Sequence, residues 1–198
     1  MDYDDNMAYW GINFGLLEGE YGLLIVKTGS GGTIYGHNNK YLTMAKKIQE
    51  KYGFGVIVSD NPVEVSAKEN MFATMQVAQR HWEENIIGDA YYFGVSKGAQ
   101  YAAMYAYKFE WVSKWLLVNM PLMINWYKSM DGLEHLCSLQ KMIFVFGDKD
   151  PSFKFVDLID LVNGKNIAKI IVPEADHNFS NMMDEFIHLP DQYLFGEC

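Results

Sequence analysis

Residues 90–98 read Ala90-Tyr91-Tyr92-Phe93-Gly94-Val95-Ser96-Lys97-Gly98, so an apolar, strand-like run leads directly into the pattern Gly-x-Ser-x-Gly. Residues 98–107 are rich in alanine, which favours a helix that can lie close against a sheet. A serine between a strand and a helix occupies a tight turn, where glycine two positions to either side relieves crowding. The Ser96 hydroxyl then projects from the carboxyl end of the strand, beside the free N–H groups that begin the helix. This setting predicts a nucleophilic serine; a glycine-rich turn without catalysis is the alternative.

Strand-like and helix-like segments alternate along the rest of the chain, which is typical of an α/β fold. Residues 7–14 and 21–28 are expected to form an antiparallel hairpin. Most later strand-like runs are apolar at nearly every position, as in a parallel sheet covered on both faces. These runs are residues 54–59, 90–95, 114–120, 141–146 and 168–172, and helices are expected at 39–52, 66–80, 98–107, 157–162 and 180–187. We therefore expect a mostly parallel sheet of about seven strands wrapped in helices, in a single domain that spans residues 1–198.

A nucleophilic serine needs a base within hydrogen-bond reach, and His177 is the strongest candidate. Of the other four histidines, His37 and His81 lie at helix ends, and His135 and His188 lie within helix-like stretches, where a surface or core role is the ordinary explanation. His177 instead lies in the loop of residues 173–179, after the last predicted strand. Because the carboxyl ends of parallel strands share one edge, we expect His177 and Ser96 to lie at the same edge of the sheet.

The carboxylate that orients the base is also expected from this edge. The strand of residues 141–146 leads into Gly147-Asp148-Lys149-Asp150-Pro151, which offers Asp148 and Asp150. Either aspartate can instead serve only to form the loop. Asp176 is a weaker candidate, since it adjoins His177 and neighbouring side chains in extended backbone diverge.

The order Ser96, Asp150, His177, with a strand before each, resembles the α/β-hydrolase family. That family's acid loop commonly reads Gly-x-x-Asp, which matches Gly147 and Asp150, and residues 175–179 resemble its histidine loop. The resemblance covers nearly the whole chain. It implies an α/β-hydrolase fold with Ser96 as nucleophile, His177 as base and Asp150, in preference to Asp148, as acid.

The family also has a glycine-rich oxyanion loop, often His-Gly-x-Gly, after its third strand. Here the corresponding residues are Thr28-Gly29-Ser30-Gly31-Gly32, with threonine where histidine is frequent. The resemblance implies that the N–H groups of Ser30 and Lys97 bind the oxyanion, with Gly31 as the alternative to Ser30. A dinucleotide loop is a weaker interpretation, because residue 34 is isoleucine where Gly-x-Gly-x-x-Gly needs glycine.

The substrate is less well defined by the sequence. The family often inserts a lid after its sixth strand, but residues 121–140 leave no room for a large cap. Apolar side chains at the start of this segment are expected either to line an acyl or alkyl pocket or to belong to the core. The residues predicted to bind substrate are Met120, Met123 and Trp126.

Composition excludes several other classes of protein. Sixteen basic against 25 acidic residues give a net charge of −9, and Arg80 is the only arginine, so nucleic acids, anionic membranes and strongly anionic substrates are disfavoured. The apolar runs are too short to span a bilayer. The acidic start of the chain is unlike a signal peptide, and only two cysteines are present, so a reducing, cytoplasmic location is expected.

These observations predict a serine hydrolase that cleaves a small-molecule carboxylic ester or thioester through an acyl-Ser96 intermediate. No metal-ligand spacing or phosphate-binding loop is present, so neither a metal nor a cofactor is expected. An amidase or peptidase would use the same three residues. A noncatalytic binding protein with this fold and a dinucleotide oxidoreductase are the alternatives from other classes.

Overall fold

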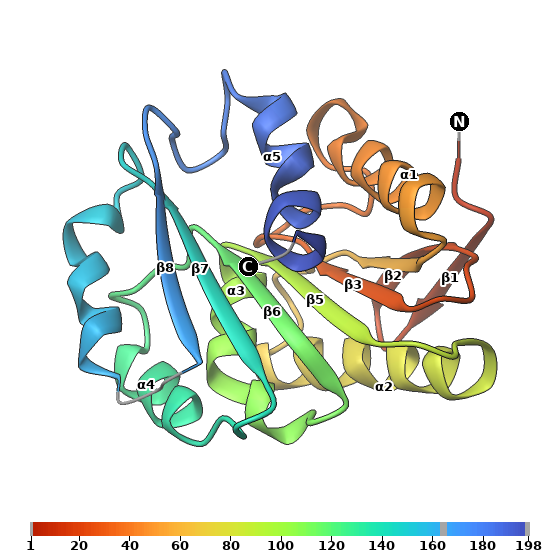
Figure 1. Ribbon diagram of the computed structural model, residues 1–198, viewed down its shortest axis with the longest axis horizontal. Helices are drawn as coiled ribbons and strands as arrows, with labels where there is room; N and C mark the ends of the chain where they lie inside the picture. Colours follow the sequence, from red (N-terminus) through yellow and green to blue (C-terminus); the bar gives the residue numbers. More distant parts are fainter. Residues whose placement is uncertain (1, 163–165, 197–198) are drawn as a thin grey trace.

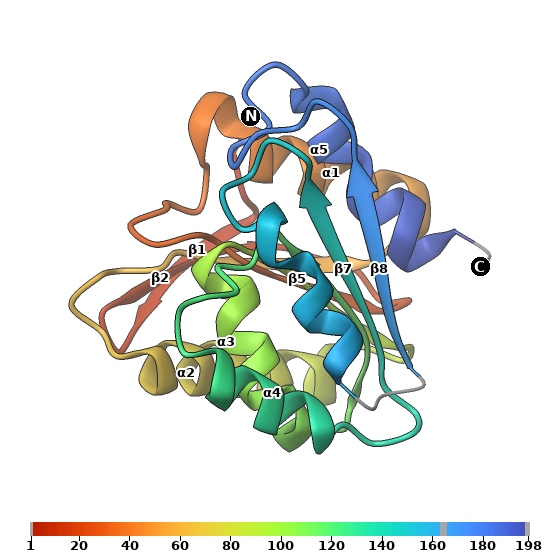
Figure 2. The ribbon, with the colours of Figure 1, turned by 90° about the vertical axis from the view of Figure 1, so that its left-hand side faces the viewer.

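An eight-stranded sheet forms the middle layer of the molecule, and helices cover both of its faces (Figures 1 and 2). The structure is a computed structural model that describes residues 2–162 and 166–196. The strands lie in the order β1-β2-β4-β3-β5-β6-β7-β8. Their bounds are Asp5–Tyr9 (β1), Ile12–Leu17 (β2), Leu23–Lys27 (β3), Gly55–Ser59 (β4), Ala90–Val95 (β5), Val112–Val118 (β6), Lys141–Gly147 (β7) and Ile167–Val172 (β8).

Strands β3 to β8 pair in parallel, whereas β2 is antiparallel to both β1 and β4. The predicted α/β fold, mostly parallel with an antiparallel hairpin at its start, is therefore confirmed. The sheet has eight strands, not about seven, because the first predicted strand is in fact two strands.

The predicted pairing of residues 7–14 with residues 21–28 is wrong. Trp10 and Gly11 have φ angles of 53° and 74°, and they form a tight turn that joins β1 to β2. Two successive positive φ angles match the twist of a hairpin, but tryptophan in place of the usual asparagine conceals the signal. All five residues of β3 are buried, and this strand lies between β4 and β5 in the parallel part of the sheet.

The helices divide into two groups (Figure 1). Helices α1 (Lys40–Tyr52) and α5 (Met183–Pro190) cover one face. Helices α2 (Ala67–Asn85), α3 (Lys97–Tyr105) and α4 (Trp126–Glu134) cover the other, together with the 3₁₀ helix η3 (Phe153–Leu161). Short helical turns are present at His37–Asn39 (η1), Ala106–Lys108 (η2) and Asp191–Phe195 (η4). Ser66 and Glu69 form the predicted capping box at the start of α2. A helix-like stretch was expected around His135, the residue that caps α4, but without bounds.

The core consists of two apolar clusters, one on each face of the sheet. Successive residues of β3 alternate between them: Leu23 and Ile25 join one cluster, while Leu24 and Val26 join the other. Burial of both faces explains why β3 is apolar throughout. Within the described parts of the chain, none of the helices combines the length and the apolar character needed to traverse a bilayer.

Candidate active site

Ser96 lies on a sharp turn between β5 and α3. Its φ and ψ angles of 50° and −112° are unusual for a residue with a side chain. Both flanking glycines are required by close packing: a Cβ on Gly94 would lie 2.9 Å from the Ala99 nitrogen, and one on Gly98 would lie 2.4 Å from the Lys27 carbonyl oxygen. The Gly-x-Ser-x-Gly pattern therefore allows α3 to approach the end of β3 and leaves the Ser96 hydroxyl at the edge of the sheet.

The structure brings Ser96, His177 and Asp150 together. The Nε2 atom of His177 lies 3.1 Å from the Ser96 Oγ atom. On the other side of the ring, Nδ1 is hydrogen-bonded to the Asp150 carboxylate. The Asp150 side chain is fully buried, and its second oxygen accepts a hydrogen bond of 2.6 Å from the Ser152 N–H, whereas 38% of the His177 side chain is exposed. The three residues follow β5, β7 and β8, so they meet at the carboxyl edge of the sheet.

The electrostatics of this arrangement favour a protonated imidazole. The hydrogen bond with Asp150 raises the pKa of His177 above its usual value of 6.5, although partial burial and the charge of Lys40 act in the opposite direction. An imidazolium that forms during proton transfer is stabilised in the same way. Lys40 was not identified from the sequence, because its effect depends on how α1 lies beside the histidine loop.

The other two aspartates near the site bind backbone groups. Asp148 accepts a hydrogen bond of 2.8 Å from the Glu174 N–H. Asp176 accepts hydrogen bonds from the N–H groups of Asn178 and Ser180, at 3.0 and 2.9 Å. The Ser180 bond is the main cause of the lowered pKa of Asp176. Both aspartates therefore shape the histidine loop, and Asp150 is the aspartate that contacts the imidazole.

The glycine-rich loop of residues 28–32 lies against Ser96. A Cβ on Gly29 would lie 3.4 Å from the Ser96 Cβ atom and 4.0 Å from its Oγ atom, so the loop is in direct van der Waals range of the serine. The Gly31 N–H donates to the Asn61 carbonyl oxygen at 2.8 Å. Among the described residues, the Ser30 N–H has no protein acceptor. Lys97 is the first residue of α3, where an N–H has no acceptor within the helix. Ser30 is therefore better placed than Gly31 to donate to an oxyanion together with Lys97.

Thr28, which stands where the family often has histidine, keeps the glycine-rich loop closed. The Thr28 hydroxyl donates to the Gly32 carbonyl oxygen at 3.0 Å and closes the turn. The buried Asn61 side chain donates to the Thr28 carbonyl oxygen at 2.9 Å and fastens the loop to the residues after β4. No sequence pattern indicated this role for Asn61, because it lies 33 residues from Thr28 along the chain.

The three residues predicted to bind substrate occupy different environments. Met120 is fully buried in the core, which is one of the two environments expected for this segment, and its role in substrate binding stays a prediction. Met123 is 58% exposed, and Trp126 is partly buried at the start of α4. The Gln100 side chain, on α3, donates to the Ile124 carbonyl oxygen and fastens this segment close to the Ser96 turn. A role for Met123 and Trp126 in substrate binding stays a prediction.

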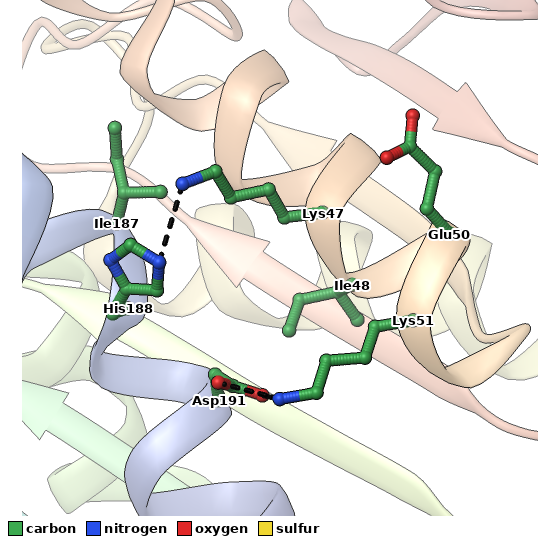
Figure 3. A pocket seen from close by; sticks show the side chains of 7 residues that line it. All are labelled: Lys47, Ile48, Glu50, Lys51, Ile187, His188 and Asp191. Atoms are coloured by element: carbon green, nitrogen blue, oxygen red, sulfur yellow. Dashed lines mark hydrogen bonds and ion pairs between the residues drawn. The ribbon is translucent and has the colours of Figure 1, made fainter.

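A pocket of about 320 Å³ lies between α1 and α5, away from these residues (Figure 3). Two side-chain contacts cross it: Lys51 pairs with Asp191 at 2.8 Å, and Lys47 Nζ lies 3.3 Å from His188 Nε2. Ser96, Asp150 and His177 do not line it. In the part of the chain that the structure describes, no three His, Cys, Asp or Glu side chains are grouped so that they could hold a metal ion.

The sheet order, the serine turn and the edge at which the three loops meet define the α/β-hydrolase fold, as predicted. Comparison with known proteins agrees. Est1E from Butyrivibrio proteoclasticus superposes with a TM-score of 0.77 and 12% identity, over 96% of this chain and 97% of that one. For a serine hydrolase homologue from Coxiella burnetii, the TM-score is 0.73 and the identity 17%, over 96% of each chain.

A third solved structure, an α/β serine hydrolase without a lid from Xanthomonas campestris, has a TM-score of 0.64 and 12% identity, over 91% of this chain and 87% of that one. No family model and no curated protein sequence matches this chain. At such low identities the likeness establishes the fold, and the activity has to be argued from the site.

Proposed function

We propose that this protein is a serine hydrolase that cleaves a carboxylic ester or thioester through an acyl-Ser96 intermediate. The observation that supports this most directly is the hydrogen-bonded series from Asp150 through His177 to Ser96. An idle serine on a glycine-rich turn would have no reason to face an imidazole that a buried carboxylate orients.

In the proposed reaction, the Ser96 oxygen attacks the acyl carbonyl carbon while its proton passes to Nε2 of His177. The N–H groups of Ser30 and Lys97 stabilise the negative charge on the carbonyl oxygen. His177 then donates the proton to the departing alcohol or thiol, and the acyl group remains on Ser96. Water, deprotonated by His177, hydrolyses this intermediate. Asp150 stabilises the imidazolium and stays ionised throughout.

A serine-directed fluorophosphonate tests the proposal. It should label the protein once, on Ser96, and mass spectrometry of peptides identifies the site. Ser96→Ala should abolish labelling and lower kcat by about 10⁴-fold or more, with an unchanged melting temperature. Labelling that survives the substitution would contradict the assignment. A protein that is not labelled at all would instead be a noncatalytic member of this fold.

The substrate is proposed to be small, because the connection between β6 and β7, which contains α4, is too short to hold a large cap over the site. A structural neighbour is likewise described as lacking a lid. Met123 and Ile124 are exposed in this connection, at 58% and 45%, and provide an apolar surface for an acyl group. Esters of roughly two to eight acyl carbons should be hydrolysed faster than longer ones, without activation at a lipid interface. A marked preference for long-chain emulsions would contradict this expectation. Matched thioesters and amides distinguish the reaction classes.

A further inference from the structure

Asn119 lies where the three loops of the site meet, directly after β6. It is fully buried and has a φ angle of 48°. The carbonyl oxygen of the preceding residue, Val118, accepts a hydrogen bond of 2.8 Å from the Ser96 N–H. The Asn119 N–H itself donates to the Val145 carbonyl oxygen on β7 at 2.9 Å. The backbone at this position therefore contacts both the serine turn and the strand that leads to Asp150.

The Asn119 side chain joins the acid loop to the histidine loop. Its Oδ1 atom accepts a hydrogen bond of 2.9 Å from the Gly147 N–H, where the acid loop begins. Its Nδ2 atom donates to the carbonyl oxygens of Asp176 and His177, both at 3.1 Å. A primary amide suits this position, because it combines one acceptor with two donors. No ionised carboxylate could make the same three bonds.

The acid loop and the histidine loop lie in direct contact at this point, so their spacing depends on the groups that pack and bond between them. A Cβ on Gly147 would lie 2.1 Å from the Ala175 carbonyl oxygen, which shows how closely the backbones approach. The hydrogen bond between His177 and Asp150 joins the same two loops. Because proton transfer is sensitive to displacements of about 1 Å, a residue that maintains this spacing affects catalysis without touching substrate.

We propose that Asn119 is a positioning residue that holds the histidine loop against the acid loop and thereby maintains the contact between His177 and Asp150. Its effect on turnover rests on the proposed function. Its effect on the His177 ring does not, so the two can be tested separately.

The test compares Asn119→Gly with Gln140→Ala. Glycine keeps the positive φ angle at position 119 and removes the amide. Gln140 is a matched control, since it is also fully buried and donates to the carbonyl oxygens of Ala106, Phe109 and Val112, at 3.2, 3.1 and 3.3 Å. It precedes β7 and so lies at the opposite edge of the sheet. Both variants should lose stability through the loss of a buried amide.

The first measurement is an NMR titration of the His177 ring. In Asn119→Gly the titration midpoint should fall by about half a pH unit or more, because the bond with Asp150 that raises this pKa is loosened. In Gln140→Ala the midpoint should match the parent protein. The second measurement is steady-state kinetics at pH 8: Asn119→Gly should lower kcat about 10- to 100-fold with KM changed less than about threefold, and Gln140→Ala should keep both within about twofold.

A folded Asn119→Gly protein with the parent titration midpoint and the parent kcat would overturn the proposal, as would an equal change in both variants. If Asn119→Gly does not fold, Asn119→Asp replaces it and is judged on kcat, because it keeps an acceptor for the Gly147 N–H and loses the donors. If the parent protein has no hydrolase activity, the proposed function fails, but the His177 titration still decides the role of Asn119.

Discussion

At the scale of single residues, the site contains three aspartates of the same chemistry with different surroundings. Asp148 and Asp176 bind backbone N–H groups of the histidine loop, whereas Asp150 is fully buried and bonded to the His177 ring. Since only the last arrangement stabilises an imidazolium, we assign the proposed role of acid to Asp150. The assignment can be tested by the matched substitutions Asp150→Asn and Asp148→Asn.

Asp150→Asn should lower kcat by about 10² to 10⁴, because the amide keeps the shape of the carboxylate but presents the wrong partner and tautomer. Asp148→Asn should lower kcat less than about tenfold, partly because it destabilises the fold. Both are measured at pH 8 with one fast ester, alongside thermal melts. If kcat falls severely in Asp148→Asn and stays nearly normal in Asp150→Asn, the acid is Asp148.

The same pair of variants predicts a change in pH dependence. The proposed base must be neutral to accept the Ser96 proton, so kcat/KM should fall as the pH drops through the His177 pKa, which the Asp150 bond raises above the usual 6.5. Removal of the carboxylate lowers that pKa, so the acid limb of Asp150→Asn should move to lower pH. The acid limb of the pH profile of Asp148→Asn should coincide with that of the parent protein. An acid limb that is the same in all three proteins would show that another group titrates.

At the scale of elements, the serine turn depends on the close contact between the start of α3 and the end of β3. Gly98 allows this contact, and the same contact places the Lys97 N–H beside the glycine-rich loop. Gly98→Ala should therefore displace the first turn of α3 and lower kcat about tenfold or more, in addition to a loss of stability.

Gly132 provides the matched control for this substitution. A Cβ at Gly132 would lie 2.3 Å from the Ala103 carbonyl oxygen, where α4 packs on α3 away from the serine turn. Gly132→Ala should lose a comparable amount of stability, measured by urea unfolding, with kcat close to that of the parent. Equal losses of kcat in both variants would mean that any displacement of α3 affects the serine turn, and that the contact with β3 has no particular role.

At the scale of the whole molecule, a buried lysine joins the end of β3 to α2. Lys27, the last residue of β3, is fully buried, and its ammonium group donates to the Asp60 carbonyl oxygen, Asn70 Oδ1 and Thr74 Oγ1 at 2.6, 2.9 and 3.1 Å. All three acceptors are uncharged groups. Burial therefore lowers the pKa of Lys27 to about 7, although the charge of Asp60 opposes this.

This lowered pKa makes stability depend on pH. Between about pH 7 and the unfolded value of 10.5, the unfolded chain binds more protons than the folded one, so this residue makes the free energy of unfolding rise with pH. The difference in the free energy of unfolding between the parent and Lys27→Met should shift in favour of the parent by about 2 kcal/mol from pH 7 to pH 9. Below pH 6 this difference should not change with pH. Urea unfolding at each pH measures it, and curves that run parallel across the range would contradict a lowered pKa.

Much of the site could be predicted from the sequence because it follows from local patterns. The strand, the glycines and the alanine-rich helix around Ser96 lie within a few residues of one another, and their turn chemistry permits one arrangement. The carboxyl ends of parallel strands share an edge, so the loops that contain Asp150 and His177 were expected to meet Ser96. That rule needs only the order of strands and helices along the chain.

Other features depend on contacts between distant segments. The place of β3 between β4 and β5, the hydrogen bond that occupies the Gly31 N–H and leaves Ser30 available, and the burial of Met120 became visible only in the folded structure. The bonds from Asn119 to the histidine loop cross 57 and 58 residues of sequence. Such bonds depend on strand register and on side-chain direction, to within a few tenths of an ångström, and no local pattern encodes them.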